Sequence, residues 1–317
     1  MRASGSKTLL IAVAALMAAL SMATPPGSAA GHLKSAAACP GNIDSLPLHT
    51  INGHQMILAI SINHAGPYDF LLDTGTQMTM IDPALATELR LENKGTAEVA
   101  SVSVHASASF AQLDLLQAGT HAVANQRVLV YDLQNLQATG LTVRGVLGED
   151  FLERFDMLID NVHKVLCLDD SAVLRADVKG QHIALMAPAL ATNGADLPSS
   201  LIVEARFSDG MRTIRLKLDS GSNASFLYNP SECLALGLFR SASLQGGGAG
   251  RAQRIFTALP PQGVKIGTVE LSKVPFITLV GARKNARTSE FDGLLELGLF
   301  KRVLIDHADH FAVLEPW

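Results

Sequence analysis

The sequence predicts a mostly β protein made of two related lobes. Its 317 residues exceed the length of roughly 100 to 200 residues that is usual for one domain. A motif of Asp, Thr or Ser, and Gly occurs twice, 146 residues apart, each time after an apolar segment of strand composition. Short apolar runs separated by turn residues fill most of the remaining chain, as in folds built from short strands. We expect one or two short helices in each lobe.

The composition excludes two broad classes of protein. Apolar residues make up 48% of the chain, enough to offset the entropy lost on ordering, so the chain is not disordered. Charged residues make up only 17% and the net charge is −4, which gives no globally basic surface. We therefore expect no nucleic-acid partner.

The N-terminus has the layout of a secretory signal peptide. A charged start at Arg2 precedes an apolar run from Leu9 to Leu20, which is too short to span a membrane comfortably. Cleavage after Ala30 or after Ala38 would follow small residues. We expect residues 1–30 to be removed and the mature protein to be exported, periplasmic or extracellular, with no membrane span. An uncleaved N-terminal anchor is the alternative.

Two β-hairpins are expected to deliver the repeated motif. The first combines residues 55–62 with residues 68–76 through a turn at 63–67, and the second combines residues 201–207 with residues 211–222. Turn residues between strand-like segments predict both hairpins. Each hairpin places its Asp at the end of the second strand.

Further landmarks occur in the same order in both halves. They are helix-like segments at 81–91 and 228–238, Gly-containing apolar segments at 145–148 and 293–296, and strands at 157–160 and 303–306. Additional strands are expected at 96–104, 110–116, 126–131, 164–168, 254–259, 264–271 and 274–280. An internal duplication explains this order. We expect the N-terminal lobe at 31–178 and the C-terminal lobe at 179–317.

Asp73 and Asp219 are the candidate catalytic residues. Two carboxyl groups within a few ångströms of each other do not both ionise easily, so they share a proton. One can act as a general base on a water molecule while the other, protonated, polarises the carbonyl under attack. The residues expected to support the two turns are Thr74, Gly75, Thr76, Ser220, Gly221 and Ser222. The alternative is that each Asp merely caps a turn after a strand.

These motifs resemble those of the aspartic proteases, in particular the retropepsin-like branch, with two lobes fused in one chain. Residues 71–76 resemble the active-site turn of the family, residues 145–152 its supporting hydrophobic-hydrophobic-Gly element, and residues 219–222 the second turn. The resemblance covers residues 43–317. It implies a bilobal acid-protease-like fold of two β-barrel-like lobes, with the active-site cleft between them.

The resemblance also implies an aspartic-type endopeptidase, a hydrolase that acts on a peptide or unfolded protein substrate without a cofactor or metal. We expect a monomer with a pseudo-twofold axis inside the chain. Gly246, Gly247 and Gly248 lie where a retropepsin has its glycine-rich flap, and a flexible hairpin tip is the alternative. In the first lobe, residues 96–109 lie where a flap would be expected, and they contain no glycine.

Two residues depart from the family pattern. Lys217 occupies a position that is usually apolar or small, where its charge either lowers the pKa of Asp219 or points to solvent. Glu296 replaces the expected Gly of the second supporting element. These departures keep two alternatives open, a catalytically degenerate peptide-binding module on the same fold and a structural exported β protein.

The cysteines and histidines indicate no further site. Cys39, Cys167 and Cys233 allow one disulfide in an oxidising compartment, and the sequence does not choose the pair. Segment 307–310 contains two His and one Asp, but its counterpart at 161–164 reads as a turn between strands. We therefore favour a turn over a metal site there.

Overall fold

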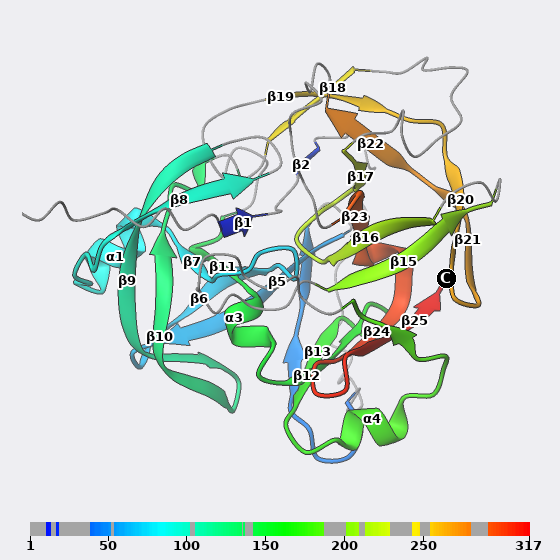
Figure 1. Ribbon diagram of the computed structural model, residues 1–317. Coiled ribbons are helices and arrows are strands. Elements are labelled where there is room, and N and C mark those ends of the chain that lie inside the picture. Colours follow the sequence, from blue (N-terminus) through cyan, green and yellow to red (C-terminus); the bar gives the residue numbers. More distant parts are fainter. Residues whose placement is uncertain are drawn as a thin grey trace, which may run out of the picture.

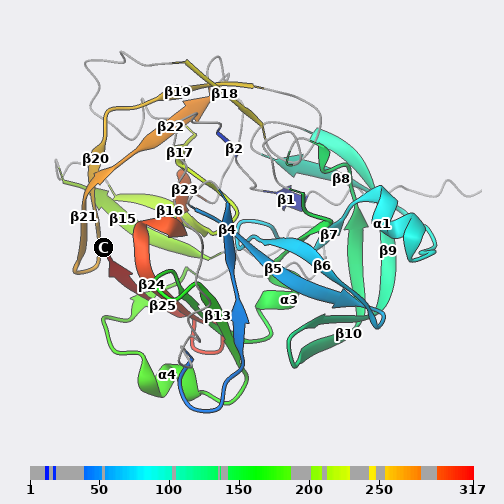
Figure 2. The same ribbon diagram turned by 180° about the vertical axis from the view of Figure 1, so that it is seen from behind.

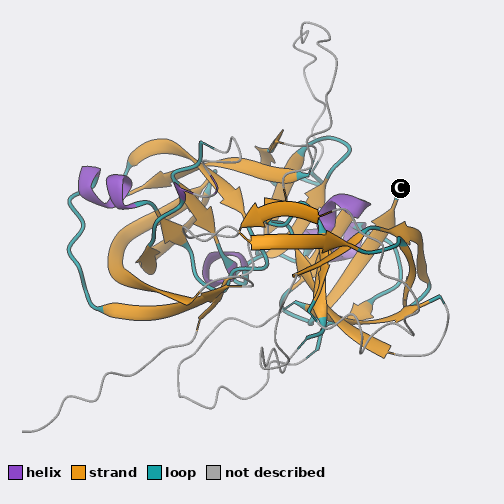
Figure 3. Ribbon diagram, turned by 90° about the horizontal axis from the view of Figure 1, so that it is seen from above, coloured by secondary structure: helices purple, strands orange, loops and turns teal. Residues whose placement is uncertain are grey.

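The computed structural model consists mainly of β-strands arranged in three sheets (Figure 1). It describes residues 11–13, 17–18, 39–51, 54–101, 105–134, 136, 142–186, 201–208, 213–228, 243–247, 254–279 and 291–317. Viewed from above, strands gather in two lobes that lie side by side (Figure 3). The prediction of a mostly β, bilobal acid-protease-like fold is confirmed.

The first lobe contains a nine-stranded sheet with the order β1-β8-β9-β10-β7-β11-β6-β5-β4. In that order its strands are β1 (Ile11–Val13), β8 (Thr96–Ser101), β9 (His105–Ala118), β10 (His121–Val130), β7 (Met80–Ile81), β11 (Gly145–Leu147), β6 (Ala65–Leu72), β5 (Gln55–Ile62) and β4 (His49–Ile51).

The second lobe contains a ten-stranded sheet with the order β2-β18-β19-β22-β17-β23-β16-β15-β20-β21. In that order its strands are β2 (Met17–Ala18), β18 (Ser243–Gly247), β19 (Arg254–Ala258), β22 (Phe276–Leu279), β17 (Ser225–Leu227), β23 (Gly293–Glu296), β16 (Thr213–Asp219), β15 (Ile202–Phe207), β20 (Gln262–Ile266) and β21 (Val269–Val274).

The centres of these two sheets have the same topology. The order β10-β7-β11-β6-β5 in the first lobe corresponds to β22-β17-β23-β16-β15 in the second. Strand directions also agree, because β11 is parallel to β6 and antiparallel to β7, as β23 is to β16 and β17. The duplication inferred from the landmarks is therefore present in the strand arrangement.

A third, six-stranded sheet takes strands from both halves of the chain and lies beside the two lobes (Figures 1 and 2). Its order is β14 (Ile183–Ala184), β25 (Phe311–Pro316), β24 (Phe300–Asp306), β12 (Asp156–Asp160), β13 (Val165–Asp169) and β3 (Ser45–Pro47).

At its centre, β12 pairs with β24, which is its own repeat copy. Leu158 is opposite Leu304, and these two residues are 146 positions apart, so the pseudo-twofold axis passes through this antiparallel pair. Hairpin β12–β13 on one side corresponds to hairpin β24–β25 on the other. The turns at 161–164 and 307–310 connect these strands, as the sequence predicted.

The described helices are short. They are α1 (Pro83–Glu88), α3 (Glu149–Leu152), α4 (Val173–Asp177) and the 3₁₀ helix η1 (Leu297–Leu299). Helix α1 begins as predicted, because Asp82 Oδ1 accepts a hydrogen bond from Leu85 N–H at 2.6 Å and Pro83 occupies the first helical position. The helix expected at 228–238 lies outside the described residues, except for Tyr228.

Two strand predictions need correction. Segment 264–271 is not one strand but two, β20 and β21, because Gly267 adopts a φ of 58° and reverses the chain. The hairpin turn predicted at 63–67 is also shorter, since β6 already begins at Ala65. Asn63 and His64, with φ of 49° and 66°, form this tight turn in the left-handed region.

One large cluster of buried apolar side chains connects the lobes. It includes Phe70 and Phe151 from the first half and Phe276 and Phe300 from the second, all fully buried. Burial of such side chains is the main favourable contribution to folding. Since the cluster crosses the repeat boundary, packing of each half depends on the other.

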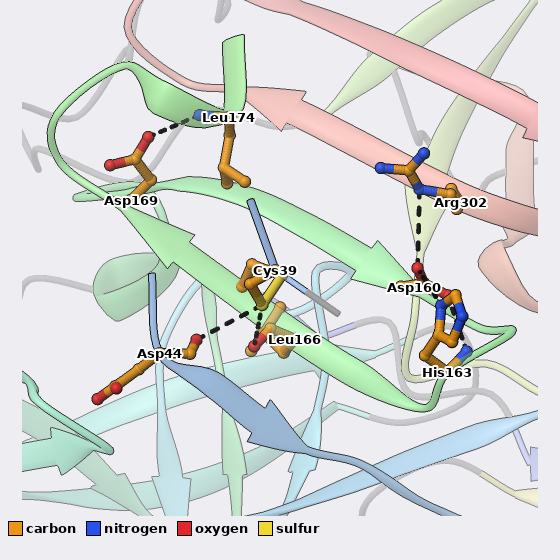
Figure 4. The surroundings of a disulfide bond; sticks show 9 residues. Cys39, Asp44, Asp160, His163, Leu166, Asp169, Leu174 and Arg302 are labelled. Atoms are coloured by element: carbon orange, nitrogen blue, oxygen red, sulfur yellow. Dashed lines mark hydrogen bonds and ion pairs between the residues drawn. A yellow bond between two sulfur atoms is a disulfide. The ribbon is translucent and has the colours of Figure 1, made fainter. Parts of the chain in front are cut away.

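The N-terminal part of the chain contributes two short strands and a disulfide. Strand β1 pairs with β8, and β2 pairs with β18, so each occupies the outer edge of one lobe sheet. Cys39 is bonded to Cys167 of β13, beside Asp44 and Leu166 (Figure 4). Cys233 lies outside the described residues. None of the helices in the described residues is both long and apolar enough to cross a membrane.

Candidate active site

The two repeated turns meet between the lobes. Strands β6 and β16 carry the chain to Asp73 and Asp219, and each strand is parallel to the supporting strand of its own lobe, β11 or β23. In the first lobe, Asp73 N–H donates to Leu147 O at 3.0 Å, which extends this pairing into the turn. The sequence-predicted residues of both turns are therefore brought together.

Thr74 and Ser220 interlock the turns through four hydrogen bonds. Thr74 N–H donates to Ser220 Oγ at 3.1 Å, and Ser220 N–H donates to Thr74 Oγ1 at 3.0 Å. The hydroxyls in turn donate across the axis, Thr74 Oγ1 to Leu218 O at 3.0 Å and Ser220 Oγ to Leu72 O at 2.9 Å. Because all four bonds are buried, they fix the relative position of the two turns.

Both motif glycines are required by the close approach of the carboxyl groups. A Cβ atom on Gly75 would lie 2.6 Å from Asp219 Cγ, and one on Gly221 would lie 2.3 Å from Asp73 Cγ. These distances are below any normal carbon contact. Each glycine thus makes room for the carboxyl group of the opposite lobe.

The two carboxyl groups are fully buried but have different hydrogen-bond partners. Asp73 accepts from Gly75 N–H at 2.8 Å with Oδ1 and from the Thr76 hydroxyl at 2.6 Å with Oδ2. Asp219 Oδ1 accepts from the backbone N–H groups of Gly221 and Ser222, at 2.9 Å and 3.0 Å. The Ser222 hydroxyl instead donates to the carbonyl of Ala224 at 2.6 Å.

Asp219 Oδ2 is buried and accepts no hydrogen bond from the described residues. The local symmetry of the sequence is therefore broken at the carboxyl groups. Only Asp73 has hydrogen-bond donors on both of its oxygens.

The pKa values of the two carboxyl groups are raised to different degrees. Burial raises the pKa of Asp73, while the Thr76 hydroxyl, the charge of Lys217 and the Gly75 N–H oppose this rise. Burial raises the pKa of Asp219 well above its ordinary value, and the negative charge of Asp73 raises it further. The pKa of Asp219 is thus raised more strongly than that of Asp73.

Residues behind the first turn include one carboxylate that sequence reasoning missed. Asp150 Oδ1 accepts from Thr79 N–H at 2.9 Å and from the Thr79 hydroxyl at 2.7 Å, and Gly148 N–H donates to the same hydroxyl at 3.1 Å. Burial raises the pKa of Asp150 to about 7 against these hydrogen bonds. Its position in the Gly-Glu-Asp sequence after the supporting element was the available signal.

The second supporting element has a similar bond but a different side chain. Glu296 N–H donates to Ser225 Oγ at 3.3 Å, in the place of the Gly148–Thr79 bond of the first lobe. The Glu296 carboxyl is almost fully buried, and burial raises its pKa to about 7. Its Oε2 lies 3.9 Å from His54 Nδ1 of the first lobe. The departure at Glu296 therefore changes a contact between lobes and leaves the turn in place.

A second contact between the halves, Glu149 with His307, was also missed. His307 Nε2 lies 3.2 Å from Glu149 Oε2, and His307 Nδ1 lies 2.7 Å from Phe155 O. Burial alone would lower the pKa of His307, but contact with the Glu149 carboxylate raises it above its ordinary value. The sequence showed His307 only as part of a turn.

Lys217 does not point to solvent. Its side chain is fully buried, and Nζ donates to Gly75 O of the opposite turn at 2.8 Å. Its positive charge opposes the rise that burial causes in the pKa values of both Asp73 and Asp219. The alternative of a solvated lysine is therefore wrong, and the expected influence on Asp219 extends to both carboxyl groups.

The proposed flap is only partly described. Gly246 and Gly247 belong to β18, which forms a hairpin with β19, and Gly248 lies outside the described residues. The first lobe has a hairpin of β8 and β9 in the region of residues 96–109. Each lobe thus contributes a hairpin, although only the second is glycine-rich.

Comparison with known proteins points to the same class as the site. Residues 58–151 match the family model described as aspartyl protease. This match confirms the resemblance to aspartic proteases and supports a protease-type function for the chain. The matched region includes Asp73 and the first supporting element.

Among solved structures, one similar protein is a retropepsin-like aspartic protease from Rickettsia conorii, with 16% sequence identity and a TM-score of 0.30. The match covers 40% of this chain and 92% of the other. The search of curated proteins found no match.

Proposed function

We propose that the protein is an aspartic endopeptidase in which Asp73 and Asp219 activate a water molecule against a peptide bond. The observation that carries this proposal is the pair of buried carboxyl groups on interlocked turns, each packed against the glycine of the opposite turn. A turn-capping role explains the contacts of each Asp within its own turn. It does not explain why the two turns are held face to face.

The unequal environments support a different role for each carboxyl in this proposal. Asp73, the ionised member, takes a proton from water as the oxygen attacks the peptide carbonyl carbon. Asp219, the protonated member, donates its proton to the carbonyl oxygen, giving a tetrahedral diol. Asp73 then returns a proton to the amide nitrogen, the carbon–nitrogen bond breaks, and Asp219 recovers its proton from the diol.

An extended peptide or an unfolded protein is the proposed substrate. The outer edges of β8 and β18 each pair with a short strand from the N-terminal segment, β1 or β2. Both edges therefore accept an extended chain by backbone hydrogen bonds, which is the mode of strand addition used in peptide recognition. The proposed enzyme is a monomer, because one chain supplies both carboxyl groups.

We further propose that the protein is exported, to the periplasm or outside the cell. The Cys39–Cys167 disulfide supports this proposal, because disulfides persist in oxidising compartments. The N-terminal sequence of the protein recovered from its native compartment tests it. A start after Ala30 or Ala38 fits removal of a signal, whereas a protein retained with Met1 in the cytoplasm would contradict export.

The catalytic proposal is tested with Asp73→Asn, Asp219→Asn and the control Asp114→Asn, which changes an exposed carboxylate on β9. Each protein is incubated with an unfolded protein substrate from pH 3 to 7. We expect cleavage by the wild type and the control, and none by either active-site variant. Equal cleavage by all four would disprove the role of the pair. Peptide binding without cleavage by the wild type would favour a degenerate peptide-binding module.

A further inference from the structure

Lys217 occupies an unusual place for a lysine. It lies on β16, two residues before Asp219, and alternation along a strand directs the two side chains to the same face of the sheet. Its neighbours in register are Ile202 on β15 and Leu294 on β23, both buried apolar residues. A fully buried ammonium group among such neighbours is costly unless an anion and hydrogen-bond acceptors compensate for the lost water.

The contacts of the ammonium group cross from the second lobe to the first. Nζ donates to Gly75 O at 2.8 Å and lies 5.7 Å from the centre of the Phe291 ring. The N–H of the same Gly75 donates to Asp73 Oδ1 at 2.8 Å. Lys217 therefore holds the carbonyl group of Gly75, and the N–H group of the same residue orients the carboxylate of Asp73.

The charge of the ammonium group acts on the carboxyl pair. With one shared proton, Asp73 and Asp219 together carry a single negative charge, which a nearby ammonium group attracts. This attraction keeps the pKa of both carboxyl groups lower than burial alone would make it. The first lobe has no equivalent cation, because the repeat counterpart of Lys217 is the fully buried Leu71.

Two other titratable groups lie near the pair in the described residues. Burial and the charge of Asp219 raise the pKa of Tyr228, which keeps this phenol neutral in the acidic range. Glu296 is the partner of Asp219 in the register of β16 and β23. Neither group carries a positive charge. Among the described residues around the pair, Lys217 is the cation that acts on it.

We propose that Lys217 is a positioning residue that holds the first active-site turn through Gly75 O and stabilises the singly protonated state of the Asp73–Asp219 pair at acidic pH. This inference rests on the proposed function for its kinetic consequences. Because a nearby cation favours the ionised form, both limits of the active pH range lie lower than they would without it. The enzyme therefore works at lower pH than a version with an apolar residue at this position.

Three substitutions separate charge from packing. Lys217→Met keeps the length of the side chain without its charge, Lys217→Gln keeps a hydrogen-bond donor without charge, and Lys217→Arg keeps the charge. Lys265→Met is the matched control, since it removes the charge of an exposed lysine on β20. Far-UV circular dichroism and thermal unfolding identify the variants that fold.

The readout is the pH profile of kcat/KM. We expect both limbs to move upward by about one to three pH units in Lys217→Met and Lys217→Gln. Lys217→Arg and Lys265→Met should keep limbs near those of the wild type. A folded Met or Gln variant whose limbs do not move would overturn the proposal. If Lys217→Met does not fold, Lys217→Gln provides the same test, because its side-chain amide can still donate a hydrogen bond to Gly75 O.

A second measurement does not require activity. The apparent pKa values of the carboxyl pair are followed by carbon-13 NMR of labelled Asp in the wild type and in the folded variants. Higher values in Lys217→Gln support the proposal, and unchanged values reject it even for a protein that cleaves. If Asp73→Asn and Asp219→Asn fail to alter cleavage, the proposed function fails, yet this titration still decides whether Lys217 acts on the pair.

Discussion

Removal of the Ser220 hydroxyl tests how the two active-site turns are held together. Ser220→Ala deletes one donor and one acceptor without adding volume, and both are buried between the lobes. Thr74 N–H loses its acceptor and Leu72 O loses a donor. The matching change on the other side of the axis is Thr74→Val, which deletes the bonds made by Thr74 Oγ1.

The expected cost follows from the number of groups left unsatisfied. Each buried polar group that loses its partner costs about 1 to 3 kcal/mol. Two such groups in Ser220→Ala should lower the free energy of unfolding by about 2 to 6 kcal/mol, which is a large part of the total stability of a typical protein. The Thr74→Val cost should be similar. Because both residues share one network, the double variant should lose less than the sum of the two.

Urea unfolding followed by far-UV circular dichroism measures these differences, provided that the denaturant slope stays constant. Thr87→Val, on the exposed face of α1, is the control and should cost little. We also expect kcat/KM of Ser220→Ala to fall by about tenfold or more, because small shifts of reacting groups are costly. A free energy of unfolding within about 0.5 kcal/mol of the wild type would refute the interlock as a stabilising feature.

Three further predictions concern packing, pH and the disulfide. Gly221→Ala should abolish cleavage in a substrate assay, because the added methyl group would lie 2.3 Å from Asp73 Cγ. The Glu149–His307 contact raises the pKa of His307, so its stabilisation should be complete below the unfolded-state pKa of about 6.5 and be lost as the pH rises through the folded-state pKa. Thermal unfolding of wild type and His307→Gln between pH 5 and 9 measures this change. Cys39→Ser should lower the free energy of unfolding by about 2 to 5 kcal/mol in urea titrations without reductant.

Each of these predictions has a result that would contradict it. An active Gly221→Ala enzyme would show that the turns separate more easily than the packing indicates. For His307, the difference in melting temperature from His307→Gln should shrink with rising pH, and a constant difference would argue against titration of this contact. For Cys39→Ser, the wild type treated with reductant is the control. A variant as stable as the untreated wild type would exclude a stabilising disulfide.

The repeated landmarks made the fold and the candidate pair predictable from sequence. Hairpin patterns identified the strands that carry Asp73 and Asp219, and the shared order of the landmarks, 146 to 148 residues apart, implied two copies related by symmetry. Thr74 and Ser220 were expected to support the two turns, and in the structure they bond to each other across the axis. Local errors arose where one residue decided the turn, as at Gly267, whose left-handed φ splits a predicted strand.

The sequence by itself determined most of the elements, their duplication and the residues that form the two turns, because these depend on local patterns and on a repeat that is visible along the chain. Only the tertiary structure decided which distant residues meet. It pairs β12 with its own copy β24, bonds Cys39 to Cys167, and places Lys217 against Gly75. Such contacts depend on how whole sheets pack, and no local periodicity encodes them. For this reason Lys217 was visible in the sequence as an exception, while its action on both carboxyl groups emerged only from the packed lobes.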